Sequence, residues 1–519
     1  MKSLKNSYDD ISGLVADIFV IAMFCVYPFY MESGYVGLSD AKYRFFLICG
    51  LIGVVALTIT GFKKLRENLK ENPLSKIQIA VIAFAIVSLI SFIFSGYKTI
   101  ALTGAPQWNM GLVTILLCCA LFFLLSILWK PKKAVIYAAL VVSAIVFILG
   151  FLDRFSVYLI PLSERNPSFI STLGNINWFV GYYSVLMPLG VGMLFMAKGR
   201  ADLEKILLYV YTGIAFICGF AQGSESVFLV FAALFILLLF LTGKRIVRFD
   251  EFLIVIIIWC LSAQALRLVM RFFPKAYNYD TDGLCAKITQ SSIPGILALI
   301  FIVILMMIWE GSGENGSYDT EKIMVRILWI VTALGAVSYV VISIIRTNTD
   351  LLPGITNSVF YWDSRFGSGR GEAYSVAFSS LKDLGIKGFL IGKGPDCFES
   401  FVYSIDPLRD RLAQVWPNDR LVNAHCELLT LLINEGLAGV IAYTAIFVAL
   451  FKTVFKKDRL DIMLGDNGAF EDKIALIGAV AVICAFIHNF VSFAHVLNIP
   501  FMFILAGMAV ASDSARKAR

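Results

Sequence analysis

Long apolar stretches recur along the whole chain, and short polar segments separate them. Several stretches carry no charged residue, among them Ile79–Phe94, Val135–Phe151 and Val227–Leu241. A helix needs about 20 mostly apolar residues to cross a bilayer. The pattern therefore predicts an all-α polytopic integral membrane protein with about fourteen transmembrane helices. We expect these helices near residues 14–31, 43–62, 77–95, 110–129, 134–152, 175–197, 204–221, 225–242, 250–270, 292–309, 325–345, 426–450, 473–488 and 494–512.

The composition agrees with this pattern. Of the 519 residues, 59% are hydrophobic and 16% are charged, and the mean hydropathy is +0.81. A soluble globular domain is nearer about 45–50% apolar and about 25% charged. The difference excludes a soluble enzyme, and it also excludes a disordered chain, a coiled coil and a disulfide scaffold.

The distribution of Lys and Arg predicts the orientation of the helices. If both termini are cytoplasmic, most of the 44 Lys and Arg residues fall on cytoplasmic segments. The short outer loops hold few of them, namely Lys42, Arg44, Lys98, Arg154, Arg165, Arg271, Lys275 and Lys287. An excess on the inner side is the positive-inside pattern of membrane proteins. We therefore attribute the net charge of +7 to topology, and we expect no nucleic-acid partner.

One polar segment is much longer than the others and divides the chain into three parts. Residues 1–345 form an eleven-span membrane region, residues 346–424 an extracytoplasmic loop between helices 11 and 12, and residues 425–519 a three-span region. A loop of this length is unusual unless it is functional. Apolar residues spaced three to four apart predict an amphipathic helix over Glu372–Leu384, which Gly385 ends. This helix lies on the membrane or covers a cavity; the alternative is a packed cap without chemistry.

Two arginines in this loop are candidates for binding phosphate. Arg365 and Arg370 stand in the run Asp363-Ser-Arg-Phe-Gly-Ser-Gly-Arg-Gly-Glu372, in which small residues surround Arg370. Small neighbours let a bulky anion approach the guanidinium, and the start of the following helix offers free N–H donors. The planar fork of arginine matches phosphate oxygens. The alternative is an ordinary solvated arginine.

His425 is the strongest candidate for acid–base chemistry. It stands at the expected start of helix 12, and helical spacing places Leu429, Leu432, Gly436 and Gly439 on its face. Small residues on that face suit tight helix packing and would direct His425 into the protein. The alternative is a structural hydrogen-bonding role. Glu435 lies about 15 Å further along such a helix, and we interpret it as a buried anchor for packing.

The sequence offers few patterns that indicate a metal site or a disulfide. The chain has three His residues, and it has no Cys-x-x-Cys motif. Asp280-Thr-Asp282 resembles half of a calcium loop, but Thr289 stands where a bidentate Glu belongs. We therefore expect no metal and no cofactor. Whether Cys285 and Cys397 form a disulfide is an open question at this point. His488 and His495 suit turn or core roles.

Four segments together resemble the O-antigen ligase and polymerase superfamily of membrane glycosyltransferases. Ser171–Pro188 contains Gly-Asn-Ile-Asn and ends in proline, and Gly367–Phe398 contains the Gly-Arg pair and a Gly-x-Gly-Pro turn. Asn423–Gly439 is similar to that family's histidine-led helix with a downstream Glu-Gly-x-x-Gly, and Ile487–Pro500 is a weaker match. Their order and the long loop before the histidine also agree. Cys426 departs from the pattern, because the family commonly has asparagine after the histidine.

The resemblance implies an enzyme of the bacterial cytoplasmic membrane with an extracytoplasmic active site. An acceptor hydroxyl on a glycan or lipid-linked glycan would attack the anomeric carbon of a polyprenyl-diphosphate-linked oligosaccharide, without a metal. Arg370, Arg365 and Arg165 would bind the departing diphosphate, and neutral His425 would accept the hydroxyl proton. Members of the family polymerise glycans, ligate them to lipid or transfer them to protein. Span count and family analogy favour a polymerase here.

Two rivals stay open at this point. A flippase or transporter of lipid-linked glycans would place ionisable residues near the bilayer midplane and would show repeated, broken helices. The expected spans are nearly free of charge, and no internal repeat is evident. A peptidoglycan-polymerase-like membrane enzyme is the second rival, although none of that family's signatures is recognisable.

Overall fold

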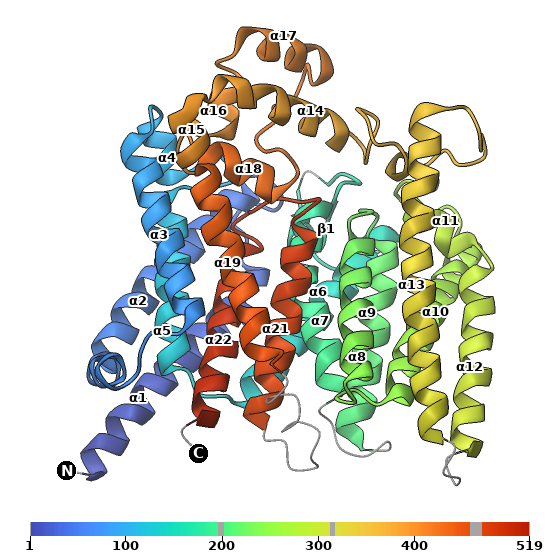
Figure 1. Ribbon diagram of the computed structural model, residues 1–519, viewed down its shortest axis with the longest axis horizontal. Coiled ribbons are helices and arrows are strands. Elements are labelled where there is room, and N and C mark those ends of the chain that lie inside the picture. The colour runs from blue at the N-terminus through green and yellow to red at the C-terminus, as the bar shows by residue number, and fades with distance from the viewer. Residues whose placement is uncertain (1, 164, 196–201, 312–316, 457–469, 518–519) are drawn as a thin grey trace.

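The computed structural model describes residues 2–163, 165–195, 202–311, 317–456 and 470–517, which are almost entirely helical (Figure 1). One small sheet is present in these residues. In it, β1 (Phe169–Ile170) pairs antiparallel with β2 (Gly174–Asn175), so that Phe169 faces Asn175 and Ile170 faces Gly174. The expected all-α class is therefore confirmed.

The helices alternate in direction and form one bundle (Figure 1). The long helices are α1 (Lys2–Ile21), α2 (Leu38–Glu71), α3 (Lys76–Phe94), α5 (Leu112–Leu128), α6 (Lys133–Arg154), α7 (Ile176–Leu194), α8 (Leu203–Ala221), α9 (Val227–Gly243), α10 (Phe249–Phe272), α12 (Ile293–Gly311), α13 (Ser317–Asn348), α19 (Gly436–Val454), α21 (Phe470–His488) and α22 (Ile499–Lys517). The short helices are α4 (Lys98–Thr103), α11 (Leu284–Gln290), α14 (Arg370–Ser380), α15 (Gly385–Ile391), α16 (Phe398–Val402), α17 (Asp406–Val415) and α18 (Glu427–Asn434). Single turns are η1 (Ala22–Val26), η2 (Tyr27–Phe29), η3 (Ser358–Phe360) and η4 (Leu381–Asp383).

The bundle is that of a multi-pass membrane protein. In the described residues, nine helices are long and apolar enough to cross a membrane: α1 together with η1 and η2 (Ile11–Phe29), α2, α3, α6, α8, α10, α12, α13 and α19. Shorter apolar helices at α5, α9 and α22 stand beside them, and α7 and α21 are almost fully buried. A helix lies at each segment expected to span the membrane, although residues 196–197 of the sixth segment lie outside the described residues.

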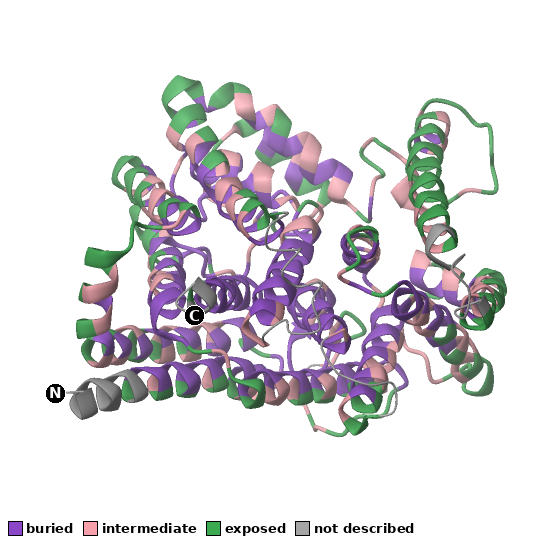
Figure 2. Cartoon of the chain, turned by 60° about the horizontal axis from the view of Figure 1, so that its bottom comes forward, coloured by how far each residue is buried: buried purple, intermediate pink, exposed green. Residues whose placement is uncertain are grey.

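Small residues let neighbouring helices approach one another closely. Gly50 and Gly61 of α2 face Leu117 and Leu128 of α5, where an added Cβ would come within 2.7 and 2.5 Å of a leucine carbon. Close backbone approach of this kind is typical of helix packing in membranes. Buried residues fill the middle of the bundle and exposed residues lie at its periphery (Figure 2).

Residues 346–424, which we call the cap segment, fold at one end of the bundle. Helices α14 to α17 lie at that end, and both termini lie at the opposite end (Figure 1). The cap segment has its own small apolar core, which includes Val376, Phe398 and Leu412. The predicted amphipathic helix corresponds to α14 and η4, but its buried face is rotated. Phe378, assigned to the apolar face by its spacing, is 59% exposed.

The expected helix 12 is two helices, and this corrects the sequence prediction. α18 ends at Asn434, and α19 begins at Gly436, whose φ of +70° is left-handed. The backbone of the Gly-x-Gly-Pro turn fills the break: the N–H groups of Lys393 and Gly394 donate to the carbonyls of Ile433 (2.9 Å) and Asn434 (2.8 Å). The cap segment therefore supplies the partners that an uninterrupted helix would have supplied.

Candidate active site beneath the cap segment

His425 lies in the loop immediately before α18, with a left-handed φ of +50°. The helical face predicted for it is therefore wrong. Asn423 Oδ1 accepts the His425 N–H at 2.9 Å, and Tyr374 of α14 donates its hydroxyl to the His425 carbonyl at 3.4 Å. The imidazole meets the ring of Phe493 edge-on, with centroids 5.4 Å apart. Its Nδ1 is buried and has no hydrogen-bond partner in the described residues.

Burial keeps the His425 imidazole neutral. Its pKa is lowered to about 3, first by desolvation and then by the positive charge of Arg370. A neutral imidazole has a lone pair that can accept a proton. A group with so low a pKa is, however, a weaker base than free histidine.

Arg370 is the first residue of α14, and a turn of small residues precedes it. Gly367, Ser368 and Gly369 all have positive φ, at 57°, 56° and 95°. The next residue, Gly371, is packed so closely that an added Cβ would lie 1.9 Å from the Asp363 carbonyl oxygen. The small residues noted in the sequence thus serve to build this turn.

The arginine is anchored on one side only. Arg370 Nε donates to the Val491 carbonyl at 2.9 Å, and Nη1 donates to the Gly367 carbonyl at 2.8 Å. Nη2 has no hydrogen-bond partner in the described residues. Burial lowers the pKa of Arg370, but an arginine keeps its charge at any physiological pH. The anchored side fixes the guanidinium, and Nη2 remains for a ligand.

Arg370 and His425 meet at the turn between α21 and α22 (residues 489–498). Arg370 binds the Val491 carbonyl of this turn, and His425 packs on its Phe493. The same turn holds the start of α18, because the Glu427 N–H donates to the Asn489 carbonyl at 2.9 Å and the Ala494 N–H donates to Glu427 Oε2. Three of the four segments singled out in the sequence therefore converge here.

A cavity of about 640 Å³ opens beside His425. Its walls come from the turn before α5, the start of α7, the end of α17 and the segment before α18. They present aromatic and polar side chains, among them Trp108, Trp178, Trp416, Asn175, Asn177 and Arg420. Flat aromatic rings suit the apolar faces of a sugar, and amide and charged groups suit its hydroxyls.

The Gly-Asn-x-Asn segment is connected to α21 by a buried chain of hydrogen bonds. Ser224 donates to Asn177 Oδ1 at 2.9 Å, the hydroxyls of Ser224 and Ser226 are 2.9 Å apart, and Ser226 lies 3.1 Å from His488 Nε2. The segment Ile487–Pro500 is thus joined to the segment Ser171–Pro188. His495 has a structural place, because its ring stacks on Trp178 at 4.6 Å and its Nε2 contacts Ser39 and Gln107.

Arg365 and Arg165, the other predicted phosphate ligands, have protein partners elsewhere. Arg365 binds both carboxylate oxygens of Asp363 and stacks on Tyr361 at 4.1 Å. Arg165 pairs with Asp153 at 3.5 Å and covers the ring of Tyr158 at 3.9 Å. Neither has a described contact with Arg370 or His425. Their roles in binding a diphosphate stay predictions.

Sequence reasoning missed two charged residues, Arg420 and Arg154. Arg420 lines the cavity, pairs with Glu399 and stacks on Tyr403 at 4.4 Å. Arg154 is completely buried, and its guanidinium donates to the carbonyls of Gln222 and Pro167. No local motif marks either residue. The signal that could have found Arg420 is its place near Trp416 in a polar loop segment. The corresponding signal for Arg154 is its position at the end of an apolar stretch.

Three buried carboxyl groups lie below the site. Asp396, Glu427 and Glu435 line a small cavity of about 30 Å³. Asp396 accepts the N–H groups of Ala105 (2.7 Å) and Met110 (3.0 Å), yet burial raises its pKa to about 6. Glu435 is 1% exposed at the break between α18 and α19, so it is buried as expected, and its role in packing stays a prediction.

Two further predictions from the sequence concern a disulfide and a metal site. Cys285 and Cys397 are both buried free thiols, and their nearest polar contacts are Ser224 and Pro395 respectively. A disulfide between them is therefore absent. Asp280 Oδ1 accepts the Asp282 N–H at 2.7 Å in a local turn. In the part of the chain that the structure describes, no group of three or more His, Cys, Asp or Glu side chains is placed to hold a metal ion.

Comparison with known proteins gives no family assignment. The chain matches no protein-family model, and no curated protein matches its sequence.

Proposed function

We propose that the protein is a membrane glycosyltransferase that polymerises or ligates polyprenyl-diphosphate-linked oligosaccharides on the extracytoplasmic face. The observation that carries this proposal is the meeting of Arg370 and His425 at the α21–α22 turn. The anchored cation acts electrostatically on a neutral imidazole, and this imidazole lines a cavity of suitable size and chemistry for sugar units. The likeness of four segments to the O-antigen ligase and polymerase superfamily supports the same reaction.

The proposal includes a topology of fourteen spans with both termini in the cytoplasm. The nine apolar helices, the shorter ones and the buried α7 and α21 would all cross the membrane. The cap segment and the site would then face the extracytoplasmic side of a bacterial cytoplasmic membrane. The excess of Lys and Arg on the opposite segments supports this orientation.

The donor diphosphate would bind at Arg370. Its unpartnered Nη2 would bind a phosphate oxygen, while Nε and Nη1 keep the guanidinium in place. When the bond between the anomeric carbon and the diphosphate oxygen breaks, negative charge collects on the leaving group. A cation already fixed in position stabilises that charge without reorganising.

The acceptor sugar would bind in the cavity against Trp108, Trp178 and Trp416. Its hydroxyl oxygen attacks the anomeric carbon, and the hydroxyl proton passes to neutral His425. The polyprenyl diphosphate leaves as the new glycosidic bond forms. No metal or cofactor has a part in this proposal.

The transporter rival has one supporting observation, the buried carboxyls of Asp396, Glu427 and Glu435. Intramembrane carboxyls mark proton relays in many transporters. These three lie near the cap end of the bundle, however, while a transport site is expected near the midplane.

One reconstitution experiment separates these functions. The purified chain in proteoliposomes would receive a polyprenyl-diphosphate-linked oligosaccharide, with either more of the same donor or a lipid-linked glycan as acceptor. We expect polyprenyl diphosphate to be released together with longer or ligated glycan. Movement of intact donor across the bilayer with no new glycosidic bond would favour the transporter instead. The Arg409→Ala variant removes an exposed cap arginine that is paired with Asp406. It serves as the control for variants of Arg370 and should behave like the wild type.

A further inference from the structure

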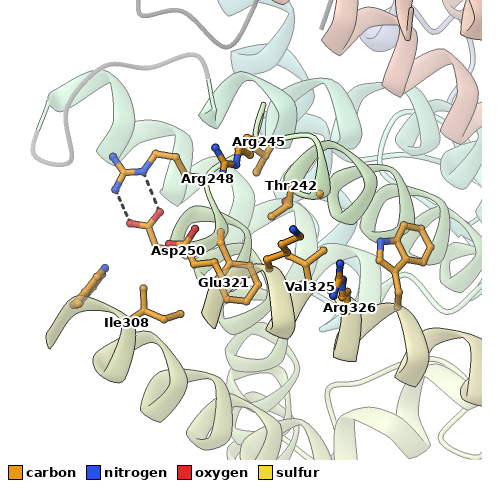
Figure 3. Close-up of a pocket in the computed structure, with 14 residues that line it drawn as sticks. Thr242, Arg245, Arg248, Asp250, Ile308, Glu321, Val325 and Arg326 are labelled. Carbon is orange, nitrogen blue, oxygen red and sulfur yellow. Dashed lines mark hydrogen bonds and ion pairs between the residues drawn. The ribbon is translucent and has the colours of Figure 1, made fainter. Parts of the chain in front are cut away.

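A second polar cavity lies at the end of the bundle opposite the cap segment. It has a volume of about 590 Å³ and lies between the end of α9, the start of α10, the end of α12 and the start of α13 (Figure 3). The chain termini lie at the same end (Figure 1). This cavity is therefore separate from the proposed active site, and neither its description nor its test depends on the glycosyltransferase proposal.

The cavity carries an excess of positive charge. Its basic lining residues are Arg245, Arg248, Lys322 and Arg326, and its acidic ones are Asp250 and Glu321. Arg248 binds both carboxylate oxygens of Asp250, at 3.1 and 2.8 Å, so this acid is already neutralised (Figure 3). Lys322 and Arg326 have no ion pair with any described residue, and both are exposed. Because they are four residues apart on α13, they share one face of the helix.

The same cations stand where the apolar stretch of α13 begins, which is where lipid headgroups lie when such a helix crosses a membrane. Directly after Arg326, residues 327–345 of α13 carry no charge, and α12 carries none from Ile293 to Trp309. Few residues of either apolar stretch are buried in the protein. Trp309 and Trp329 line the cavity, and tryptophan favours the interface between hydrocarbon and headgroups. The cavity thus opens where two lipid-facing helices reach the membrane surface.

We propose that this cavity binds the headgroup of an anionic phospholipid. The phosphate would lie between Lys322, Arg326 and the α9–α10 segment, and the acyl chains would lie along the exposed apolar faces of α12 and α13. Basic pockets between transmembrane helices bind such headgroups, and each nearby cation strengthens the attraction. A free phosphate would use the cations but not the apolar faces.

Native mass spectrometry of the purified full chain tests this proposal, with phosphatidylglycerol as the probe. We expect one tight site whose affinity falls at least about tenfold in Lys322→Ala/Arg326→Ala, because two cations are lost. The swapped variant Lys322→Arg/Arg326→Lys keeps both charges and should keep the affinity. Arg271→Ala/Lys275→Ala, which removes two exposed cations at the other end of α10, is the matched control. Size-exclusion profiles and melting curves confirm that each variant is folded.

Three outcomes would overturn the proposal. One is an unchanged phosphatidylglycerol affinity in Lys322→Ala/Arg326→Ala. Another is binding of phosphatidylcholine as tight as that of phosphatidylglycerol, which would show that headgroup charge is not recognised. The third is displacement of the lipid by millimolar inorganic phosphate, which would assign the cavity to a free anion.

Discussion

At the scale of single residues, the surroundings of His425 change the pKa that is expected of a histidine. The sequence identified the residue, but its left-handed backbone and buried Nδ1 depend on contacts with Asn423, Tyr374 and Phe493. These contacts come from segments distant in sequence, except for Asn423. A free histidine titrates near pH ~6.5, whereas desolvation lowers the pKa of His425 to about 3.

This lowered pKa gives a prediction for pH dependence. The proposed active form is the neutral imidazole, which persists down to about pH 4 when the pKa is about 3. Between pH 5 and 8, protonation of His425 should therefore cause no loss of kcat/KM. The measurement is the rate as a function of pH at a low concentration of the lipid-linked donor, where the rate reports kcat/KM. A drop in kcat/KM with an apparent pKa near 6.5, abolished in His425→Gln, would contradict the buried environment described for His425.

Arg370 provides a second residue-scale prediction. In Arg370→Lys, one ammonium group replaces a guanidinium that donates to the Val491 and Gly367 carbonyls and still has Nη2 for a ligand. Lysine keeps the charge but lacks the planar fork. We expect most transferase activity to be lost, whereas Arg365→Lys should lose less, because Arg365 already binds Asp363. Glycan transfer at the wild-type rate by Arg370→Lys would refute the diphosphate role.

At the scale of elements, the helices were largely predictable and the helix break was not. Apolar stretches located a helix at every expected segment, because spanning a bilayer demands a long uncharged run. The break at Gly436 falls inside a mostly apolar run, because the pattern of Leu-Leu-Ile-Asn-Glu-Gly-Leu-Ala predicts one helix. Its cause is non-local: the backbone of Lys393 and Gly394 replaces the missing helical partners. The rotated face of α14 has a similar cause, because the cap core decides which side is buried.

The helix break can be tested by Gly436→Ala. The residue has a φ of +70°, and an added Cβ would lie 2.4 Å from the carbonyl carbon of Leu390 in α15. Left-handed strain costs roughly 1–2 kcal/mol, and overpacking costs a further 1–3 kcal/mol or so. We expect a clearly lower melting temperature in detergent. Gly213→Ala in α8 is the matched control, because nothing lies within 4 Å of its added Cβ, and it should be neutral or slightly stabilising. Equal melting of the two variants would argue against a strained break.

At the scale of the whole molecule, the candidate site depends on four distant segments that meet at one end. The sequence could indicate each segment through its resemblance to a family, but not their contacts. The hydrogen bonds from Arg370 to Val491 and from Ser224 to Asn177 join residues far apart in the chain. The aromatic cavity also escaped prediction, since Trp108, Trp178 and Trp416 come from three separate elements.

The proposed orientation of the whole molecule is open to a labelling test. Ser368 in the cap segment and Ser514 at the end of α22 are both exposed, at opposite ends of the bundle. Single cysteines at these positions, in a background without native exposed thiols, would be treated with an impermeant thiol reagent in intact cells. We expect labelling at position 368 and none at 514 until the cells are opened. Labelling of position 514 alone would invert the topology.

Turnover by His425→Ala tests the central claim most directly. The measurement is glycan transfer per folded molecule, with purified lipid-linked donor and glycan acceptor, alongside donor binding to the same preparation. We expect donor binding and folding close to wild type, because Arg370 keeps its anchors at Val491 and Gly367. Turnover should fall about 10²- to 10⁴-fold, the usual contribution of a general base. Near wild-type turnover in a well-folded His425→Ala protein would contradict the claim and leave His425 as a packing residue against Phe493.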